Sequence, residues 1–153
     1  MRRKLSGSEL GVLRARAAYQ WDWRVAEALL PSPEGFQIDV VRGRIRYVIF
    51  KGAVYLTLRP NDGLFSPSKA AAERIIRSSQ PPRYRIIIRG DREIRGSILA
   101  RDVVSIDPDL KPGDEVVIVD QEDNLVGVGR LRVPPSMIEG LMYGEVARVR
   151  SRA

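Results

Sequence analysis

Residues 96–147 carry four blocks that decide the fold, which are, in order, Gly96-Ser97-Ile98-Leu99-Ala100, Lys111-Pro112-Gly113-Asp114-Glu115-Val116, Gly127-Val128-Gly129 and Gly144-Glu145-Val146-Ala147. Aliphatic runs that are closed by turn residues predict short strands. Such runs cover residues 84–88, 97–106, 115–120, 125–131 and 145–149. Several short strands at this spacing are typical of a small barrel, with room for brief helices only near residues 91–95 and 135–141.

The first half of the chain has a different pattern. Apolar residues recur at steps of three or four, so we expect one amphipathic helix from Ser6 or Ser8 to the residue before Pro31. Residues 36–41, 45–50 and 54–58 alternate as strands of an antiparallel meander. Turns are expected at Arg42-Gly43 and Lys51-Gly52.

A second helix is expected from Ser66-Pro67, with serine as N-cap and proline at N1, through Ser78. Ser78-Ser79-Gln80-Pro81-Pro82 would interrupt any helix, so we place a domain boundary there. The predicted fold class is α+β, with a helix and antiparallel-sheet domain at residues 1–82 followed by a small β-barrel at residues 83–153.

The charge of the chain favours an anionic partner. The formal net charge is +7, with 14 basic and 7 acidic side chains in residues 1–82 and 12 of each in residues 83–153. Only four of the 26 basic residues are lysines, and arginine binds phosphate through a bidentate fork and stacks on bases. Abundant arginine is also compatible with a hot habitat, in which surface ion pairs are favoured, and composition does not separate the two readings.

The composition also limits the chemistry. The chain has no cysteine and no histidine, so thiolate nucleophiles, cysteine-ligated zinc and imidazole bases are excluded. We expect no cofactor, no metal and no catalytic residue. Apolar runs are short, and no signal-peptide pattern follows Met1, so we expect a cytoplasmic protein with no membrane partner.

The second half resembles the PUA domain, the RNA-binding module named after pseudouridine synthases and archaeosine transglycosylases. The four blocks quoted above carry the resemblance over about seventy residues, a usual domain size. Gly96 suits a close backbone approach, Pro112-Gly113 a turn, and Gly127 and Gly129 a strand that bends or passes close to another.

The first half is similar to the domain that precedes PUA in archaeosine tRNA-guanine transglycosylase, an archaeal enzyme family. The matching residues are Ala18-Tyr19-Gln20-Trp21 and two segments of the run from Gly43 to Leu64, Gly43-Arg44-Ile45-Arg46 and Leu58-Arg59-Pro60-Asn61-Asp62-Gly63-Leu64. In that family a separate barrel, with aspartates and a cysteine/histidine zinc site, replaces a guanine in tRNA. These 153 residues contain no such barrel, so the resemblance implies the tRNA-binding part alone.

Arginines at three places are candidate RNA contacts. The resemblance places the turn at Gly96-Ser97 against RNA, flanked by Arg92, Arg95 and Arg101, although ion pairs with Asp91, Glu93 and Asp102 are the alternative. Arginines that alternate along a strand project from one face of the sheet. Such a row can bind successive phosphates of a nucleic acid, and the alternative is that it is an ordinary solvent-exposed face. The alternating arginines are Arg130 and Arg132, Arg148 and Arg150, and, across the first hairpin, Arg42, Arg44 and Arg46. Tyr19 and Trp23 lie one helical turn apart, and we expect them to face the core.

Aspartates in predicted turns are the remaining candidates for chemistry: Asp62, Asp107, Asp109, Asp114 and Asp120. Their spacing fits no metal loop, and residues 120–124 are more simply a hairpin turn. We therefore expect a non-catalytic RNA-binding protein whose partners are tRNA or another structured RNA. The detached tRNA-binding subunit of a split archaeosine transglycosylase, working with a separate catalytic chain, is the first hypothesis. A free-standing PUA protein that serves ribosomes or another RNA-modifying enzyme is the alternative.

Overall fold

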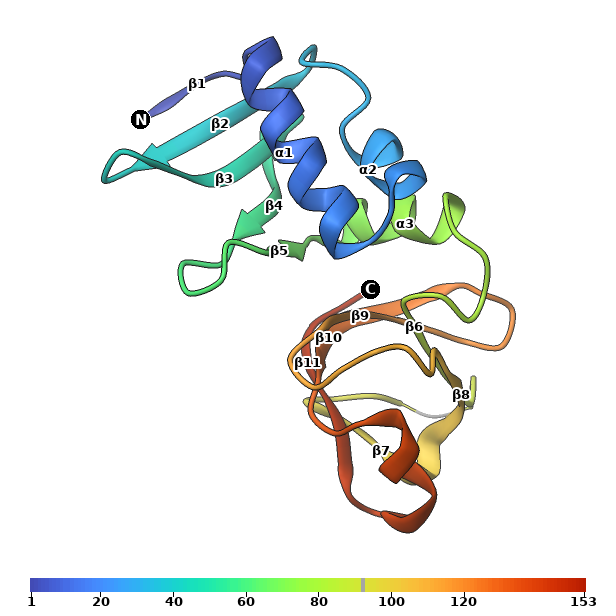
Figure 1. Ribbon diagram of the computed structural model, residues 1–153. Coiled ribbons are helices and arrows are strands. Elements are labelled where there is room, and N and C mark those ends of the chain that lie inside the picture. Colours follow the sequence, from blue (N-terminus) through green and yellow to red (C-terminus); the bar gives the residue numbers. More distant parts are fainter. Residues whose placement is uncertain (92) are drawn as a thin grey trace. The chain divides into compact units, whose positions relative to one another are not determined.

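The computed structural model describes residues 1–91 and 93–153, which form two compact units, Met1–Ser79 and Gln80–Ala153 (Figure 1). The first unit combines helices with an antiparallel sheet, and the second is a curled sheet with short 3₁₀ turns. The predicted α+β class is confirmed. In the described residues no helix is long and apolar enough to cross a membrane.

The sheet of the first unit has five antiparallel strands in sequential order. They are β1 (Arg2–Lys4), β2 (Phe36–Val41), β3 (Arg44–Phe50), β4 (Ala53–Leu58) and β5 (Phe65–Pro67). The predicted meander β2-β3-β4 is confirmed. Both turn residues of Arg42-Gly43 (φ 53° and 75°) and of Lys51-Gly52 (φ 51° and 78°) are left-handed, as two-residue type I′ hairpins require. The two outer strands have only three residues each and were not predicted.

Two helices replace the single N-terminal helix that the sequence predicted. Ser6 is the N-cap of α1 (Gly7–Gln20) and forms a capping box with Glu9, as expected. A second helix, α2 (Trp23–Leu29), begins because the Asp22 carboxylate accepts a hydrogen bond from the Val25 amide at 2.9 Å. The prediction of an uninterrupted helix is wrong, since a cap in its interior starts a new one.

The third helix also begins later than predicted. Ser66 and Pro67 lie in β5, where Pro67 pairs with Leu56, and do not start a helix. Ser68 is the N-cap of α3 (Lys69–Arg77), because its hydroxyl accepts a hydrogen bond from the Ala71 amide at 3.2 Å. Ser68, two residues after Ser66, is therefore the N-cap that the sequence analysis expected at Ser66.

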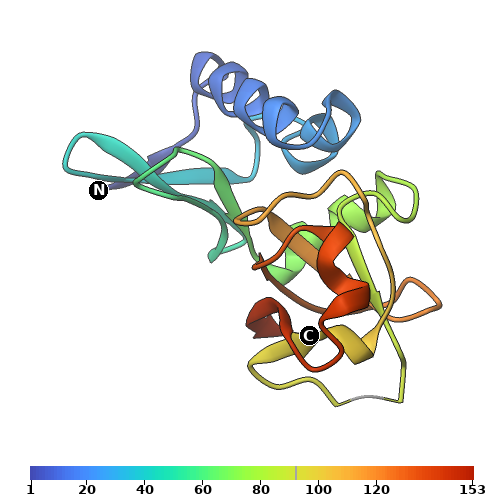
Figure 2. The same cartoon turned by 60° about the horizontal axis from the view of Figure 1, so that its bottom comes forward.

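The helices bury one side against the sheet, and α1 crosses one face of it (Figures 1 and 2). The buried residues of α1 are Leu10, Leu13 and Ala17, at helical spacing. Tyr19 and Trp23 lie off this stripe and are 83% and 61% exposed, so the prediction that they face the core is wrong. Trp21 is the buried aromatic at this helix end, and it stacks on Phe65.

The sheet of the second unit has six strands in the order β7-β11-β10-β9-β6-β8, antiparallel except for the parallel pair β6 and β9. They are β6 (Arg85–Ile88), β7 (Ser97–Leu99), β8 (Val103–Ile106), β9 (Glu115–Val119), β10 (Leu125–Leu131) and β11 (Glu145–Arg152). A 3₁₀ turn at Ala100–Asp102 divides the strand predicted at 97–106, and another at Pro135–Gly140 matches the predicted brief helix. No helix forms at residues 91 and 93–95, where Ile94 instead enters the core.

The curled sheet encloses an aliphatic core formed by residues such as Ile86, Ile98, Ile118 and Val146. Gly127 and Gly129 pack directly under β11, as predicted from sequence. A Cβ at Gly127 would lie 2.7 Å from the Ser151 carbonyl oxygen, and one at Gly129 would lie 2.2 Å from that of Arg148. Only glycine fits at these positions without moving the neighbouring strand.

Candidate nucleic-acid interface

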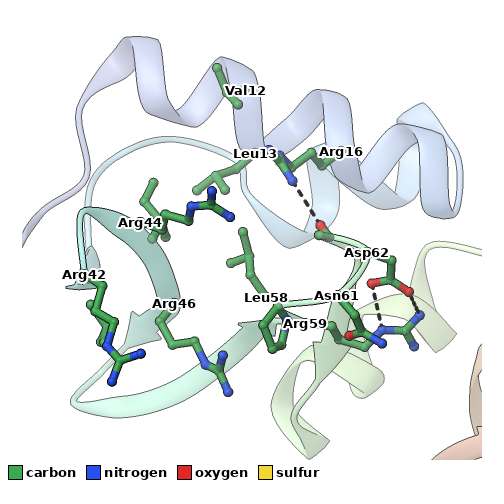
Figure 3. A pocket seen from close by; sticks show the side chains of 14 residues that line it. Val12, Leu13, Arg16, Arg42, Arg44, Arg46, Leu58, Arg59, Asn61 and Asp62 are labelled. Atoms are coloured by element: carbon green, nitrogen blue, oxygen red, sulfur yellow. Dashed lines mark hydrogen bonds and ion pairs between the residues drawn. The ribbon is translucent and has the colours of Figure 1, made fainter.

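A cleft of about 1050 Å³ opens in the first unit between α1, the β2–β3 hairpin and the loop 59–63 (Figure 3). We call it the arginine cleft. Its walls include the predicted candidates Arg42, Arg44 and Arg46, which the hairpin presents on one side. Two further arginines, Arg16 and Arg59, come from the opposite elements. Apolar side chains complete the lining, which includes Val12, Leu13, Val41, Ile45 and Leu58.

The arginines of this cleft fall into two groups. Arg59 forms an ion pair with Asp62, and Arg16 donates a hydrogen bond to the Gly63 carbonyl at 3.2 Å. Over residues 1–91 and 93–153, no carboxylate lies within ion-pair distance of the three hairpin arginines. Their charge is therefore available to an anionic ligand.

The turn that precedes β7 forms the second candidate surface. Arg95 and Gly96 are exposed and lie at the shared edge of two shallow hollows of about 510 and 340 Å³. The Gly96 carbonyl accepts a hydrogen bond from the Val149 amide at 2.9 Å, so β11 fixes this backbone. A Cβ added to Gly96 would meet nothing within 4 Å, and the space beside it is open to a partner.

Arg101 belongs to the same surface and contacts an aromatic ring. Its guanidinium lies 5.2 Å from the centroid of the exposed Tyr143 ring. Among the described residues, neither Arg95 nor Arg101 forms an ion pair with Asp91, Glu93 or Asp102, which was the alternative to RNA contact. Arg92, the third arginine predicted here, lies outside the described residues.

Two glutamates hold four arginines, Arg130 in β10, Arg132 just after it, and Arg148 and Arg150 in β11. Glu115, whose side chain is 1% exposed, lies 3.6 Å from Arg130 and forms a close ion pair with Arg150. Glu145 contacts Arg132 at 3.7 Å and Arg148 at 3.3 Å. Because Arg130 and Arg148 are direct cross-strand neighbours, these carboxylates relieve a like-charge repulsion. Much of the charge of these four arginines is therefore used within the protein.

Ser97 connects the turn to this network. Its hydroxyl donates a hydrogen bond to the Glu145 carboxylate at 2.6 Å. This bond, together with Arg148 and Arg132, holds the pKa of the Glu145 carboxyl below its usual range. Ser97 is thus a fixed part of the turn, and Gly96 and Arg95 are its accessible residues.

Backbone amides bind four of the five turn aspartates, and the fifth, Asp109, pairs with Arg83. Asp107 accepts hydrogen bonds from the amides of Tyr84 and Asp109, and Asp120 accepts them from the amides of Glu122 and Asn124. Asp62 and Asp114 accept from the amides of Leu64 and Lys111 in the same way. Within the described part of the chain, no group of three or more acidic residues is arranged to hold a metal ion.

Two family models match this chain. Residues 12–82 match the patch-forming domain C2 of tRNA-guanine transglycosylase, and residues 91–152 match the PUA domain. The chain is therefore similar to the C-terminal part of tRNA-guanine transglycosylases, a C2 domain followed by a PUA domain. The arginine cleft lies in the C2 domain, and the turn at Arg95-Gly96 lies in the PUA domain.

Curated relatives and a solved structure extend this assignment. A tRNA-guanine(15) transglycosylase of Methanobrevibacter smithii is 27% identical over 93% of this chain and 22% of its own length. One of Methanococcus maripaludis is 33% identical over 86% of this chain and 21% of its own. The chain spans about a fifth of these relatives. The solved structure of a PUA domain protein of Thermoplasma acidophilum shares the fold, with a TM-score of 0.61 and 16% identity. The match covers 97% of this chain and 91% of that protein.

Sequence reasoning did not find several side chains of these surfaces. In the C2 domain it omitted Arg59 and Asn61 as candidates, because only the tertiary structure brings the loop 59–63 and the β2–β3 hairpin to one cleft. In the PUA domain it omitted Tyr143 and Arg152, which lie far along the chain from the turn they approach. Long-range contacts of this kind have no local sequence signal.

Proposed function

We propose that this protein is the tRNA-binding subunit of a split archaeosine tRNA-guanine transglycosylase and works in trans with a catalytic barrel. The observation that carries the proposal is the succession of a C2 domain and a PUA domain along the chain, with relatives named tRNA-guanine(15) transglycosylase. The PUA domain supports RNA binding by the chain.

The distribution of charge supports the same proposal. The C2 domain carries the excess basic residues, and its three hairpin arginines have no carboxylate partner among the described residues. Four of the five turn aspartates accept hydrogen bonds from backbone amides, Asp109 pairs with Arg83, and the chain contains no histidine or cysteine. In this proposal the chain contributes no reacting group and orients tRNA for a barrel, which lowers the entropic part of the barrier.

The test is complementation of a truncated relative. The Methanococcus maripaludis transglycosylase, shortened by the fifth that aligns with this chain, is assayed for exchange of labelled guanine into tRNA with and without this protein. We expect no exchange by this chain alone and restored exchange by the mixture. Exchange by the chain alone would overturn the non-catalytic role.

A second outcome favours the alternative function. The solved PUA domain protein of Thermoplasma acidophilum covers nearly the same length as this chain, so this fold is found in a chain of about this size. If the protein binds tRNA but neither binds nor activates the truncated barrel, the proposal becomes a free-standing RNA-binding protein that serves ribosomes or another RNA-modifying enzyme.

A further inference from the structure

The arginine cleft of the C2 domain has the size of a small-ligand site. Its volume of about 1050 Å³ lies just above the range for pockets that enclose a drug-sized molecule, roughly 300–1,000 Å³. Every residue that lines it lies between Val12 and Gly63, so the first unit forms it alone. A site of these dimensions has room for a nucleotide.

One wall of the cleft is rigid before any ligand binds. In the loop 59–63 the Gly63 amide donates to the Arg59 carbonyl at 2.9 Å, and the Asp62 carboxylate pairs with Arg59. The Leu64 amide donates to Asp62 at 3.0 Å, and Arg16 holds the Gly63 carbonyl. A wall already fixed by internal bonds loses little entropy on binding.

Asn61 of this loop has a side chain suited to binding a nucleobase. The amide of Asn61 has both donors and acceptors, it lines the cleft, and no hydrogen bond occupies it among the described residues. Arg59 and Asp62 on either side are bound to each other. Asn61 can therefore offer a donor and an acceptor to the polar edge of a base.

The opposite wall provides charge next to exposed apolar surface. Arg44 and Arg46 belong to β3 and Arg42 to the turn before it, and all three line the cleft, Arg46 at an irregularity in the β2–β3 pairing. Val12 is 56% exposed and Val41 is 45% exposed in the same cleft. A phosphate alone leaves these valines in water, whereas a base also covers them.

We propose that the arginine cleft binds a single unstacked nucleotide of a single-stranded RNA segment. The phosphate lies against Arg42, Arg44 and Arg46, the base covers Val12 and Val41, and Asn61 binds the base edge. Duplex RNA hides the faces of its bases, so only single-stranded or extruded nucleotides satisfy this site. The inference rests on the proposed function and specifies the part of the RNA that the C2 domain binds.

The experiment uses the full chain and three synthetic RNA probes. They are a single-stranded pentanucleotide, the same strand with its central base removed, and a blunt duplex, each titrated at fixed salt. Affinity is measured by anisotropy, and the site is located from the NMR amide signals of Gly43, Gly63 and the Asn61 side chain. A free nucleoside monophosphate is a fourth probe, which shows whether the site needs a chain at all.

We expect the pentanucleotide to shift the cleft signals and the duplex to leave them unchanged. Removing the base weakens binding about fivefold or more, because the contacts to Val12, Val41 and Asn61 are lost. Arg44→Ala weakens the pentanucleotide about tenfold, as loss of a charge-assisted bond does. Arg77→Ala is the matched control, because Arg77 is an exposed arginine of α3 that does not line the cleft.

Two results would overturn the inference. One is equal affinity for the intact and base-deleted strands, and the other is a duplex that shifts the cleft signals as strongly as the single strand. Whole tRNA is titrated separately, so that failure of the cleft inference can be distinguished from failure of the proposed function. Binding of tRNA without any change at the cleft removes this inference alone, whereas absence of tRNA binding removes the proposed function.

Discussion

Substitution of Gly96 by arginine sets steric fit against charge at the PUA turn. An added Cβ meets nothing within 4 Å, and the Gly96 carbonyl bond to Val149 does not involve a side chain. The free energy of unfolding should therefore change by less than about 0.5 kcal/mol. If RNA approaches this backbone, the new side chain fills the space the RNA needs, and binding weakens by roughly 1–3 kcal/mol, about 5- to 150-fold.

If only charge mattered, Gly96→Arg would strengthen RNA binding instead of weakening it. One more guanidinium on an exposed surface would strengthen binding by about 0.2–1 kcal/mol. Gly90→Arg is the matched control, since Gly90 is exposed, lines neither hollow and gains the same charge. Affinity for labelled tRNA is measured by anisotropy at fixed salt, with thermal unfolding as the check on folding. A tRNA trimmed of its single-stranded 3′ end tests whether the turn contacts the acceptor end. A folded Gly96→Arg protein that binds tRNA as tightly as its parent would refute the reasoning.

Three further substitutions test separate parts of the structure. Arg95→Ala should weaken tRNA binding by roughly 1–3 kcal/mol in the same anisotropy assay, and a loss well under 1 kcal/mol would show a merely solvated side chain. Burial raises the pKa of Tyr55 to about 12 from 10.0, so this tyrosine stabilises the fold below pH 10 and the effect is lost as the pH rises to 12. Tyr55→Phe should remove that alkaline loss and cost about 1 kcal/mol at neutral pH, because the bond to the Leu29 carbonyl disappears, as denaturant titrations at several pH values would show. Gly63→Ala should cost about 1–2 kcal/mol in the same titrations, since φ is +71° and the new Cβ would lie 2.5 Å from Arg16, and an unchanged midpoint would show that the loop relaxes.

The longer strands of both domains could be predicted from local sequence, whereas the three-residue strands β1 and β5 and some helix ends could not. Alternation and the Arg42-Gly43 and Lys51-Gly52 turns placed the meander to within a residue. Asp22 lies within the single helix that the periodicity predicted, although its carboxylate starts a new helix. Caps of this kind depend on one hydrogen bond that periodicity does not reveal.

The candidate site was predictable where it is local and unpredictable where it depends on tertiary contacts. The period-two spacing of Arg42, Arg44 and Arg46 placed three arginines on one side of a hairpin, and the structure shows them lining one cleft. The same spacing gave no sign that Glu115 and Glu145 would hold Arg130, Arg132, Arg148 and Arg150. Glu115 comes from β9, where it is paired with Arg130, and Glu145 is the first residue of β11. These ion pairs therefore depend on how the strands are paired in the sheet.

The exposure of Tyr19 and Trp23 shows a similar limit. One helical turn between two aromatics is as compatible with an exposed face as with a buried one. Trp21, two residues away, fills the buried position against Phe65, and the other two rings remain in solvent. Trp21 is the C-cap of α1, whereas Tyr19 lies off the buried stripe of α1 and Trp23 is the first residue of α2.

The measurement that tests the central claim most directly is the affinity of the full chain for tRNA as a function of salt. Each phosphate contact contributes a log–log slope of about −0.7 to −0.9, so a few contacts predict roughly −3 to −6. The double substitution Arg42→Ala and Arg44→Ala should make this slope shallower by about one to two units, because two unpaired guanidinium groups are lost. A steep slope that this double substitution reduces is the predicted result, and a tRNA affinity that does not change with salt would contradict the claim that this protein binds tRNA through its arginines.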